Sequence, residues 1–270
     1  MPEQVNCVLA QLNPRLLDKK ANLERALSAI EEASRGGADL LVFPELFLAG
    51  YYMRERTKSE AEPLEGLSLS RLARSAKEHH TVVVVGFPEL DGEAVYNSAA
   101  VIDADGRILG AHRKAHLYGV EPEYFVAGDR FQVFDTTVGR IGIQICFDVE
   151  FPETARLLAL SGARILISAS ANMKPFEAYQ DVYLRARAME NQIFHVLVNR
   201  VGKEEDTDFF GHSGVSDPSG NLVVDAGEQE GLFYGSIKTF LIHEATSALN
   251  YLDNRRPELY GGLTRESLSQ

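Results

Sequence analysis

Three polar side chains of different chemistry follow strand-like apolar segments of this chain. Glu45, Lys114 and Cys146 each lie at, or just beyond, the end of such a segment. In α/β sheets, sites form beyond the carboxyl ends of the strands. A carboxylate, an ammonium and a thiol at one site suffice for acyl transfer, because the carboxylate accepts the thiol proton, the thiolate attacks and the ammonium stabilises the oxyanion. Glu45 acts as this base only if burial raises its pKa.

The thiol ends a segment whose alternation predicts a strand. Isoleucine occupies every second position from 141 to 145, so we expect Cys146 on the opposite face. Pro152 is typical of the first residue of a helix, so a turn separates strand from helix. Backbone N–H groups and a helix amino end are expected to lower the thiol pKa and to stabilise an oxyanion. The alternative is that Cys146 is a small buried apolar residue, as most lone cysteines are.

The three residues also have purely structural interpretations. Glu45 resembles a solvated loop acid, and Lys114 lies in a cationic cluster typical of a solvated hairpin end. Phe-Pro-Glu occurs twice more: we expect Glu89 to be exposed at a hairpin turn, and Glu153 to favour the dipole in the first turn of a helix. Only Glu45 among these acids ends a strand expected to be covered on both faces. The position of all three residues at strand ends favours one shared site.

Four histidines are alternative bases for the thiol: His112, His116, His195 and His212. His195 lies in an apolar segment and is typical of a core histidine. No papain-like or caspase-like pattern surrounds Cys146. The spacing of Asp and His residues does not indicate a metal site, and the dinucleotide-binding pattern G-x-G-x-x-G is absent, so we expect no metal and no cofactor.

Composition limits the partners of the chain. Its 270 residues include 27 basic and 39 acidic residues, for a net charge of −12. That balance argues against general binding to nucleic acid or to an anionic membrane. The first residues do not resemble a signal peptide, which has a basic segment followed by an apolar one. No apolar segment approaches the length that spans a bilayer. The two cysteines, Cys7 and Cys146, are far apart in sequence. We therefore expect a cytoplasmic protein with free thiols.

Periodicity predicts an α/β chain of two similar halves in a single domain over residues 1–270. The order is βαβαβ followed by hairpins, then the same again, and two sheets packed face to face with helices outside fit this order. Residues 54–65 are expected to form an irregular surface loop. The expected helices are 18–35, 67–79, 152–161, 176–190 and 240–248; the expected strands are 5–11, 39–43, 81–86, 94–103, 107–114, 131–135, 140–146, 164–170, 192–200, 211–217, 222–225 and 231–237.

Several motifs, in order along nearly the whole chain, resemble those of the nitrilase superfamily of carbon–nitrogen hydrolases. They are Phe-Pro-Glu-Leu at 43–46, Tyr-Asn-Ser-Ala at 96–99, His-Arg-Lys-Ala-His-Leu at 112–117, Gly-Ile-Gln-Ile-Cys-Phe-Asp at 142–148 with Phe-Pro-Glu at 151–153, Arg-Ala-Arg-Ala-Met-Glu-Asn-Gln at 185–192 and Asn-Arg-Val-Gly at 199–202. His112 stands where tyrosine is common in the family.

The resemblance implies a four-layer α-β-β-α sandwich and a Glu45–Lys114–Cys146 triad that forms a covalent thioester. It also implies a second glutamate after the lysine, for which Glu121 is preferred to Glu123 because of its spacing to the downstream Gly-Asp pair. The family's monomers pair, so a homodimer or higher homo-oligomer is expected, with the polar tail at about 250–270 contacting a partner subunit.

The reaction is inferred from the residues that follow the thiol. Nitrilases usually have Cys-Trp-Glu, whereas this chain has Cys-Phe-Asp at 146–148. This difference favours hydrolysis of small aliphatic amides, with N-carbamoyl hydrolysis, omega-amidase or nitrilase activity, and a non-catalytic binding protein as alternatives. The Phe147 N–H is expected to help hold the oxyanion. The expected acyl-pocket residues are Tyr51, Tyr118, Asn172 and Met173, with Phe147, Phe151 and Phe176 also in suitable loops; Lys174 and Arg200 are possible partners for a substrate carboxylate.

Overall fold

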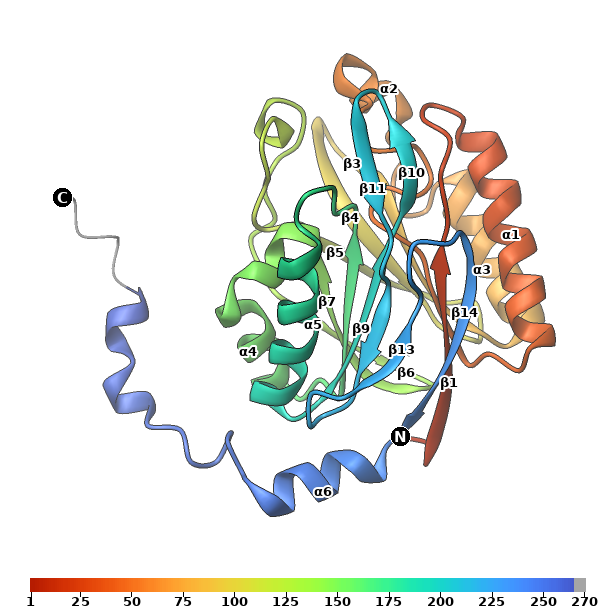
Figure 1. Ribbon diagram of the computed structural model, residues 1–270. Coiled ribbons are helices and arrows are strands. Elements are labelled where there is room, and N and C mark those ends of the chain that lie inside the picture. The colour runs from red at the N-terminus through yellow and green to blue at the C-terminus, as the bar shows by residue number, and fades with distance from the viewer. Residues whose placement is uncertain (265–270) are drawn as a thin grey trace.

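The computed structural model describes residues 1–264, whose strands form two six-stranded sheets and one separate hairpin (Figure 1). The first sheet contains β1 (Gln4–Gln11), β2 (Leu40–Val42), β3 (Val82–Asp91), β4 (Ala94–Ile102), β5 (Ile108–Arg113) and β14 (Gly231–Lys238). Its order is β14-β1-β2-β3-β4-β5. Strands β1, β2 and β3 are parallel, and the outer strands are antiparallel to their neighbours.

The second sheet repeats this arrangement. It contains β6 (Val133–Thr136), β7 (Gly139–Ile145), β8 (Ile165–Ser170), β9 (Phe194–Asn199), β12 (Gly214–Ser216) and β13 (Leu222–Asp225). Its order is β13-β12-β9-β8-β7-β6, with β7, β8 and β9 parallel. The expectation of two similar halves therefore corresponds to two sheets with matching strand order.

Six α-helices lie within residues 1–264, and four of them cover the outer faces of the sheets. They are α1 (Lys19–Arg35), α2 (Thr57–Glu60), α3 (Leu67–His79), α4 (Pro152–Leu160), α5 (Glu177–Asn191) and α6 (Phe240–Ala248). Helices α1 and α3 pack on the first sheet, and α4 and α5 pack on the second (Figure 1). The predicted α-β-β-α sandwich is confirmed.

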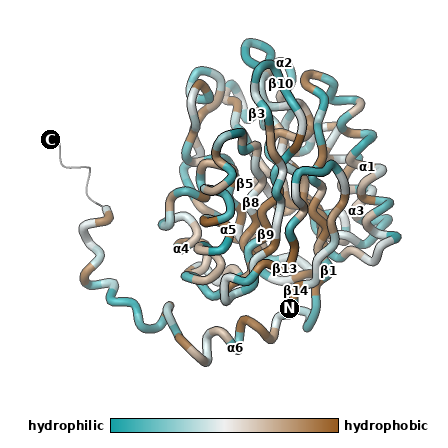
Figure 2. The backbone as a smooth tube through the Cα atoms, viewed as in Figure 1, coloured by the Kyte–Doolittle hydropathy of each residue, from teal (hydrophilic) through white to brown (hydrophobic). Residues whose placement is uncertain are grey.

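The apolar pattern of each strand explains this layering. In β2, Leu40 and Val42 face the core between the sheets, whereas Leu41 faces the helices. Isoleucines of β7 and β8 fill the core from the other side. Figure 2 shows apolar central strands surrounded by more polar loops. A strand buried on both faces cannot slip by one residue without exposing its apolar side chains, so the register at the strand ends is fixed.

Two regions differ from the expectation. Residues 54–65 contain the 3₁₀ turn η1 (Arg54–Arg56) and helix α2 instead of an irregular loop. The hairpin of β10 (Val201–Glu204) and β11 (Thr207–Phe210) was not predicted, because its strands are only four residues long and are joined by a charged turn.

The prediction that Glu89 is exposed is wrong. Strand β3 stays paired with β4 as far as Asp91, so the hairpin turn comes later than expected and Glu89 lies within the sheet, 5% exposed. Its carboxylate accepts hydrogen bonds from the Arg113 guanidinium (2.6 Å) and the Ser98 hydroxyl (2.6 Å). A buried charge is stable here because it is paired.

After β14, the chain leaves the sandwich through α6 and extends away from it (Figure 1). The 3₁₀ turns η4 (Pro257–Leu259) and η5 (Gly261–Thr264) follow, and large apolar side chains of this segment are exposed, among them Leu249, Leu259 and Leu263. The tail expected to contact a partner is described only as far as residue 264, and positions 265–270 lie outside the described residues. Across the described part of the chain, none of the helices has the length and apolar character needed to cross a membrane.

Candidate active site

A buried ammonium joins two buried carboxylates beyond the ends of the strands in the first sheet. Lys114 follows β5, and its Nζ donates to Glu45 Oε1 (2.7 Å) and to Glu121 Oε1 (2.8 Å). Exposure of the three side chains is 0% for Lys114, 0% for Glu45 and 4% for Glu121. The 3₁₀ turn η2 (Glu121–Glu123) carries Glu121 inward, whereas Glu123 is exposed.

Glu45 is held by the turn that ends β2. This turn crosses β3 at Gly86, where a Cβ atom would lie 2.4 Å from both Pro44 O and Leu46 N, so only glycine allows the close approach. Asn97 Nδ2 donates to Glu45 Oε1 (2.7 Å). Within residues 1–264, the other oxygen, Oε2, is buried without a hydrogen-bond partner. Glu45 therefore keeps one oxygen free to accept a proton.

The charges at Lys114 follow from its surroundings. Burial lowers the pKa of Lys114, but the carboxylates of Glu45 and Glu121 and the nearby thiol outweigh burial and raise this pKa well above its usual value. The lysine is therefore an ammonium. Two of its three N–H groups have carboxylate acceptors in the described structure, which leaves the third for a ligand.

Two further groups fix Glu121. The Tyr51 hydroxyl donates to Glu121 Oε1 (2.8 Å), and the Tyr118 backbone N–H donates to Oε2 (2.8 Å). Tyr51 in turn is held by Glu204 of the hairpin β10–β11, whose carboxylate accepts its backbone N–H (2.9 Å). This contact was missed because the hairpin was missed. Tyr51 contacts Glu121 but is not among the residues that line the cavity described below.

Cys146 begins the 3₁₀ turn η3 (Cys146–Glu150) directly after β7, at the edge of the second sheet. Its φ of +46° is left-handed and uncommon for a residue with a side chain. The predicted face of this thiol is wrong: the pleat stops before Cys146, and the side chain packs in the same core cluster as the isoleucines of β7. The side chain is 7% exposed.

An asparagine holds the thiol. Cys146 Sγ donates to Asn172 Oδ1 (3.1 Å), and Asn172 Nδ2 donates to Gln180 Oε1 (2.8 Å). Asn199 fixes the backbone of Asn172, since its Oδ1 accepts the Asn172 N–H (2.7 Å) and its Nδ2 donates to the Asn172 carbonyl (3.1 Å). Asn172 and Asn199 follow β8 and end β9, so parallel strands supply the support for the nucleophile.

The expected lowering of the thiol pKa is wrong. Burial raises the pKa of Cys146 well above its usual value, and the negative charges of Glu45 and Glu121 raise it further, while Lys114 opposes them. Burial also raises the pKa of Glu45, although Lys114 lowers it in part. Cys146 is therefore a protonated thiol at rest, and conversion to a thiolate would require a base.

Asp148 ties the lysine segment to the cysteine turn. Its side chain is fully buried and accepts hydrogen bonds from the Ile145 N–H (3.1 Å) and the His116 N–H (2.9 Å). It also contacts His112 Nε2 (3.1 Å) and His116 Nδ1 (2.8 Å). Although burial alone raises the pKa of Asp148, these histidine contacts lower it below its ordinary value. The sequence contains the residues but gives no signal of this contact.

The four alternative histidine bases have other partners. His112 and His116 contact Asp148, and His195 contacts Ser168 Oγ (2.8 Å) and the Leu184 carbonyl (2.9 Å). Burial lowers the pKa of His195 to about 3, so it is the neutral core histidine that was predicted. His212 is 41% exposed. Within residues 1–264, none of the four forms a hydrogen bond with Cys146.

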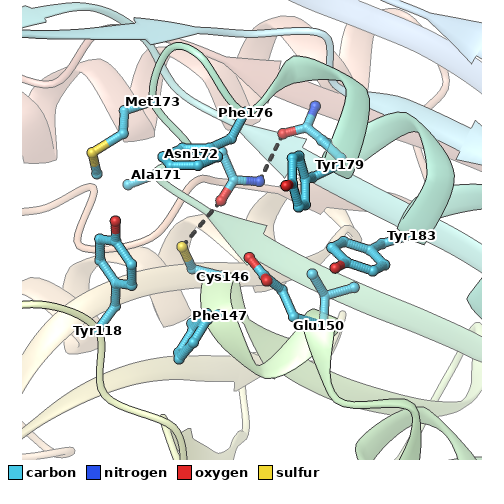
Figure 3. Close-up of a pocket in the computed structure, with 12 residues that line it drawn as sticks. Tyr118, Cys146, Phe147, Glu150, Ala171, Asn172, Met173, Phe176, Tyr179 and Tyr183 are labelled. Carbon is cyan, nitrogen blue, oxygen red and sulfur yellow. Dashed lines mark hydrogen bonds between the residues drawn. The ribbon is translucent and has the colours of Figure 1, made fainter.

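Cys146 opens into a cavity of about 120 Å³ (Figure 3). The cavity is lined by Tyr118, Cys146, Phe147, Val149, Glu150, Ala171, Asn172, Met173, Phe176, Tyr179, Gln180 and Tyr183. Of the seven residues expected at the acyl pocket, the cavity lining includes five, and Tyr51 and Phe151 are the two exceptions. Phe151, Lys174 and Arg200 do not line it, and Arg200 is instead buried in an ion pair with Glu204. In residues 1–264, no group of three or more His, Cys, Asp or Glu side chains is placed to hold a metal ion.

Known proteins resemble the chain along most of its length. The family described as carbon-nitrogen hydrolase matches residues 8–245. A protein of Pseudomonas protegens named for its place in the pqqF 5′ region, a hydrolase, is 40% identical over 95% of this chain and 91% of its own. An (R)-stereoselective amidase of Pseudomonas sp. is 38% identical over 95% of this chain and 93% of its own. The structure of a mutant amidase of Nesterenkonia sp. AN1 in complex with butyramide has a TM-score of 0.85, at 29% identity, and covers 96% of each chain.

We expect Asp148→Asn to weaken the link between the lysine segment and the cysteine turn. Loss of the buried charge beside two histidines should lower the free energy of unfolding by about 2–4 kcal/mol. Chemical denaturation followed by circular dichroism measures this change. Asp135→Asn is the control, because Asp135 forms a solvent-exposed pair with Arg140 and its loss should change stability by less than about 1 kcal/mol. Equal effects of the two substitutions would contradict the role of Asp148.

Proposed function

The chain belongs to the carbon–nitrogen hydrolase family, and we propose that it hydrolyses small aliphatic amides to a carboxylic acid and ammonia through a thioester on Cys146. One observation carries this proposal: the Cys146 thiol opens into a small cavity lined mainly by apolar and aromatic residues. The ionised groups that act on the pKa of this thiol are buried. Such a cavity suits a short acyl chain. The amidase names of relatives, and the butyramide bound to one of them, agree with this substrate class.

The first half of the reaction forms the thioester. Glu45 accepts the Cys146 proton on its free oxygen, and the sulfur attacks the amide carbon. The third N–H of Lys114 and the backbone N–H of Phe147 stabilise the oxyanion. The C–N bond then breaks as Glu45 passes its proton to the leaving nitrogen, and ammonia departs.

The second half releases the acid. Glu45, again a carboxylate, takes a proton from water, and the resulting hydroxide attacks the thioester carbon. The C–S bond breaks, the sulfur regains a proton from Glu45 and the carboxylic acid leaves. Glu121 acts by holding the ammonium in place, because both carboxylates share Lys114 Nζ.

The absence of a basic side chain among the described residues that line the cavity favours uncharged amides over substrates that carry a carboxylate. N-carbamoyl amino acids and the substrates of omega-amidases carry a carboxylate that requires a cationic partner. Within residues 1–264, no Lys, Arg or His side chain lines the cavity, and its one ionisable acid is Glu150. A carboxylate-bearing substrate would therefore meet repulsion.

We expect the protein to release ammonia from butyramide and pentanamide faster than from N-carbamoylglycine, glutaramate or butyronitrile. An ammonia-release assay gives kcat/KM for each compound, and mass spectrometry of the quenched enzyme detects the acyl group on Cys146. Cys146→Ala should abolish both signals. Release from the carbamoyl compound or the nitrile alone would contradict the amide preference. Ammonia release by Cys146→Ala at the wild-type rate would exclude Cys146 as the nucleophile, and no release from any of the compounds by the wild type would indicate a non-catalytic protein.

The reaction should weaken in acid because Glu45 must be a carboxylate to accept the thiol proton. Burial raises the pKa of Glu45 above the ordinary value of 4.5. As pH falls through this raised pKa, Glu45 becomes protonated and kcat/KM for butyramide should fall. Glu45→Gln should reduce kcat/KM by about 100- to 10,000-fold at neutral pH. Glu123→Gln is the control, since Glu123 is exposed; an acid limit at the pKa of an ordinary glutamate would count against Glu45 as the base.

We propose that the chain assembles as at least a homodimer in which the extended segment after β14 contacts the partner. The exposed apolar residues Leu249, Leu259 and Leu263 support this proposal. Sedimentation equilibrium at micromolar concentration should give at least twice the mass of one chain. A monomer mass under these conditions would refute the assembly.

A further inference from the structure

One carboxylate at the cavity has no part in the mechanism above. Glu150 ends the turn η3 that begins with Cys146, so nucleophile and acid belong to the same five-residue turn and line the same cavity. Figure 3 shows the Glu150 side chain near Cys146 on the side toward Tyr183. Glu150 is exposed to solvent.

Glu150 has no ion-pair partner within residues 1–264. The nearby cation, Arg187, is engaged elsewhere: its Nη1 pairs with Glu190 (3.0 Å), and its Nε and Nη2 donate to the backbone carbonyls of Val149 (2.8 Å) and Glu150 (3.0 Å). Arg187 thus holds the backbone of the turn, and its guanidinium lies over one face of the Tyr183 ring, 5.2 Å from the centroid, without forming an ion pair with the Glu150 carboxylate. Partial burial raises the pKa of Glu150, and Tyr183 and Arg187 offset this only in part. The Glu150 carboxylate therefore lies at the cavity without a cation in ion-pair contact in the described part of the chain.

Three neighbouring aromatic residues line the cavity together with Glu150. Tyr179 lies between Phe176 and Tyr183, with ring centroids 5.7 Å and 6.3 Å away, respectively. All three line the cavity. Aromatic faces attract ammonium groups, most strongly where water is partly excluded. A carboxylate and several aromatic rings, with no basic lining residue in the described chain, are complementary to a cation.

We propose that Glu150, Tyr179 and Tyr183 form a subsite for a protonated amine, so that the enzyme prefers amides whose acyl chain carries an ammonium group. This inference rests on the proposed amidase function and narrows its substrate class. Glu150 determines specificity without touching the amide bond that breaks. The ammonium group of the substrate would be the positively charged partner that the Glu150 carboxylate does not have in the free protein.

Three amides of similar length and different charge test the subsite: 4-aminobutanamide, neutral pentanamide and anionic glutaramate. The measured quantity is the ratio of kcat/KM for 4-aminobutanamide to that for pentanamide. Glu150→Gln should lower this ratio at least about tenfold. Glu150→Lys should lower it further and raise the relative rate for glutaramate. A ratio that is the same in the wild type and Glu150→Gln would overturn the proposal.

The matched control is Glu153→Gln. Glu153 lies in the first turn of α4, is exposed and does not line the cavity. Removing its charge changes the net charge of the protein as Glu150→Gln does, so a long-range effect would appear equally in both variants. The ratio should stay at the wild-type value in Glu153→Gln, and an equal drop in both would overturn the subsite.

A measurement without amide hydrolysis separates failure of the subsite from failure of the proposed function. Methanethiosulfonates transfer their alkylthio group to Cys146 and release methanesulfinate. Cys7 is fully buried, so the reaction reports Cys146, and Cys146→Ala provides the blank. The rate ratio of the aminoethyl reagent to the sulfonatoethyl reagent should fall at least about tenfold in Glu150→Gln but not in Glu153→Gln. Unchanged ratios would overturn the subsite even if butyramide is hydrolysed, whereas changed ratios without any amide hydrolysis would refute only the amidase activity.

Discussion

The site depends on one buried ammonium shared by two buried carboxylates. Lys114 Nζ lies 2.7 Å from Glu45 Oε1 and 2.8 Å from Glu121 Oε1, and the lysine is inaccessible to water. Removing three charges from water is unfavourable unless each is closely paired. Burial raises the pKa of the Cys146 thiol, and the two carboxylates raise it further against the opposing effect of Lys114, so the sulfur stays protonated at rest. In the proposed mechanism one of these carboxylates, Glu45, is also the base, so a group that disfavours the free thiolate is the one proposed to generate it.

The two sheets divide the chemistry between them. Glu45 follows β2 and Lys114 follows β5 in the first sheet, whereas Cys146 and Asn172 follow β7 and β8 in the second. The carboxylate and ammonium of the first sheet therefore meet the thiol of the second only when the sheets pack face to face. Asp148 joins the two parts, since it accepts hydrogen bonds from both the cysteine turn and the segment after Lys114. Packing of the apolar core thus determines the alignment of the reacting groups.

The architecture was predictable from local patterns, whereas the expectation that Glu45, Lys114 and Glu121 share one site rested on strand-end positions and on the family resemblance. Continuous apolar runs identified buried strands, and motif order identified the family. Contacts between distant segments were not predictable in this way: Asn97 reaches Glu45 across 52 positions, and His112 reaches Asp148 across 36. The shift of the thiol pKa was predicted with the wrong sign because a turn can be read from sequence, whereas the burial of the thiol and its distance from two carboxylates depend on the tertiary structure. Glu89 was misplaced because strand pairing, and not the apolar run, sets where β3 ends.

The burial of Cys146 limits which molecules can reach its thiol. Cys146 is 7% exposed at the base of a cavity of about 120 Å³. A folded protein presents its peptide bonds within a chain that continues in both directions, so a peptide bond approaches a buried thiol less readily than a free small molecule does. Asparagine and glutamine side chains, although they are primary amides, are carried on the same bulky backbone. If the proposed amidase activity holds, burial of the thiol would therefore restrict hydrolysis to amides carried on free small molecules.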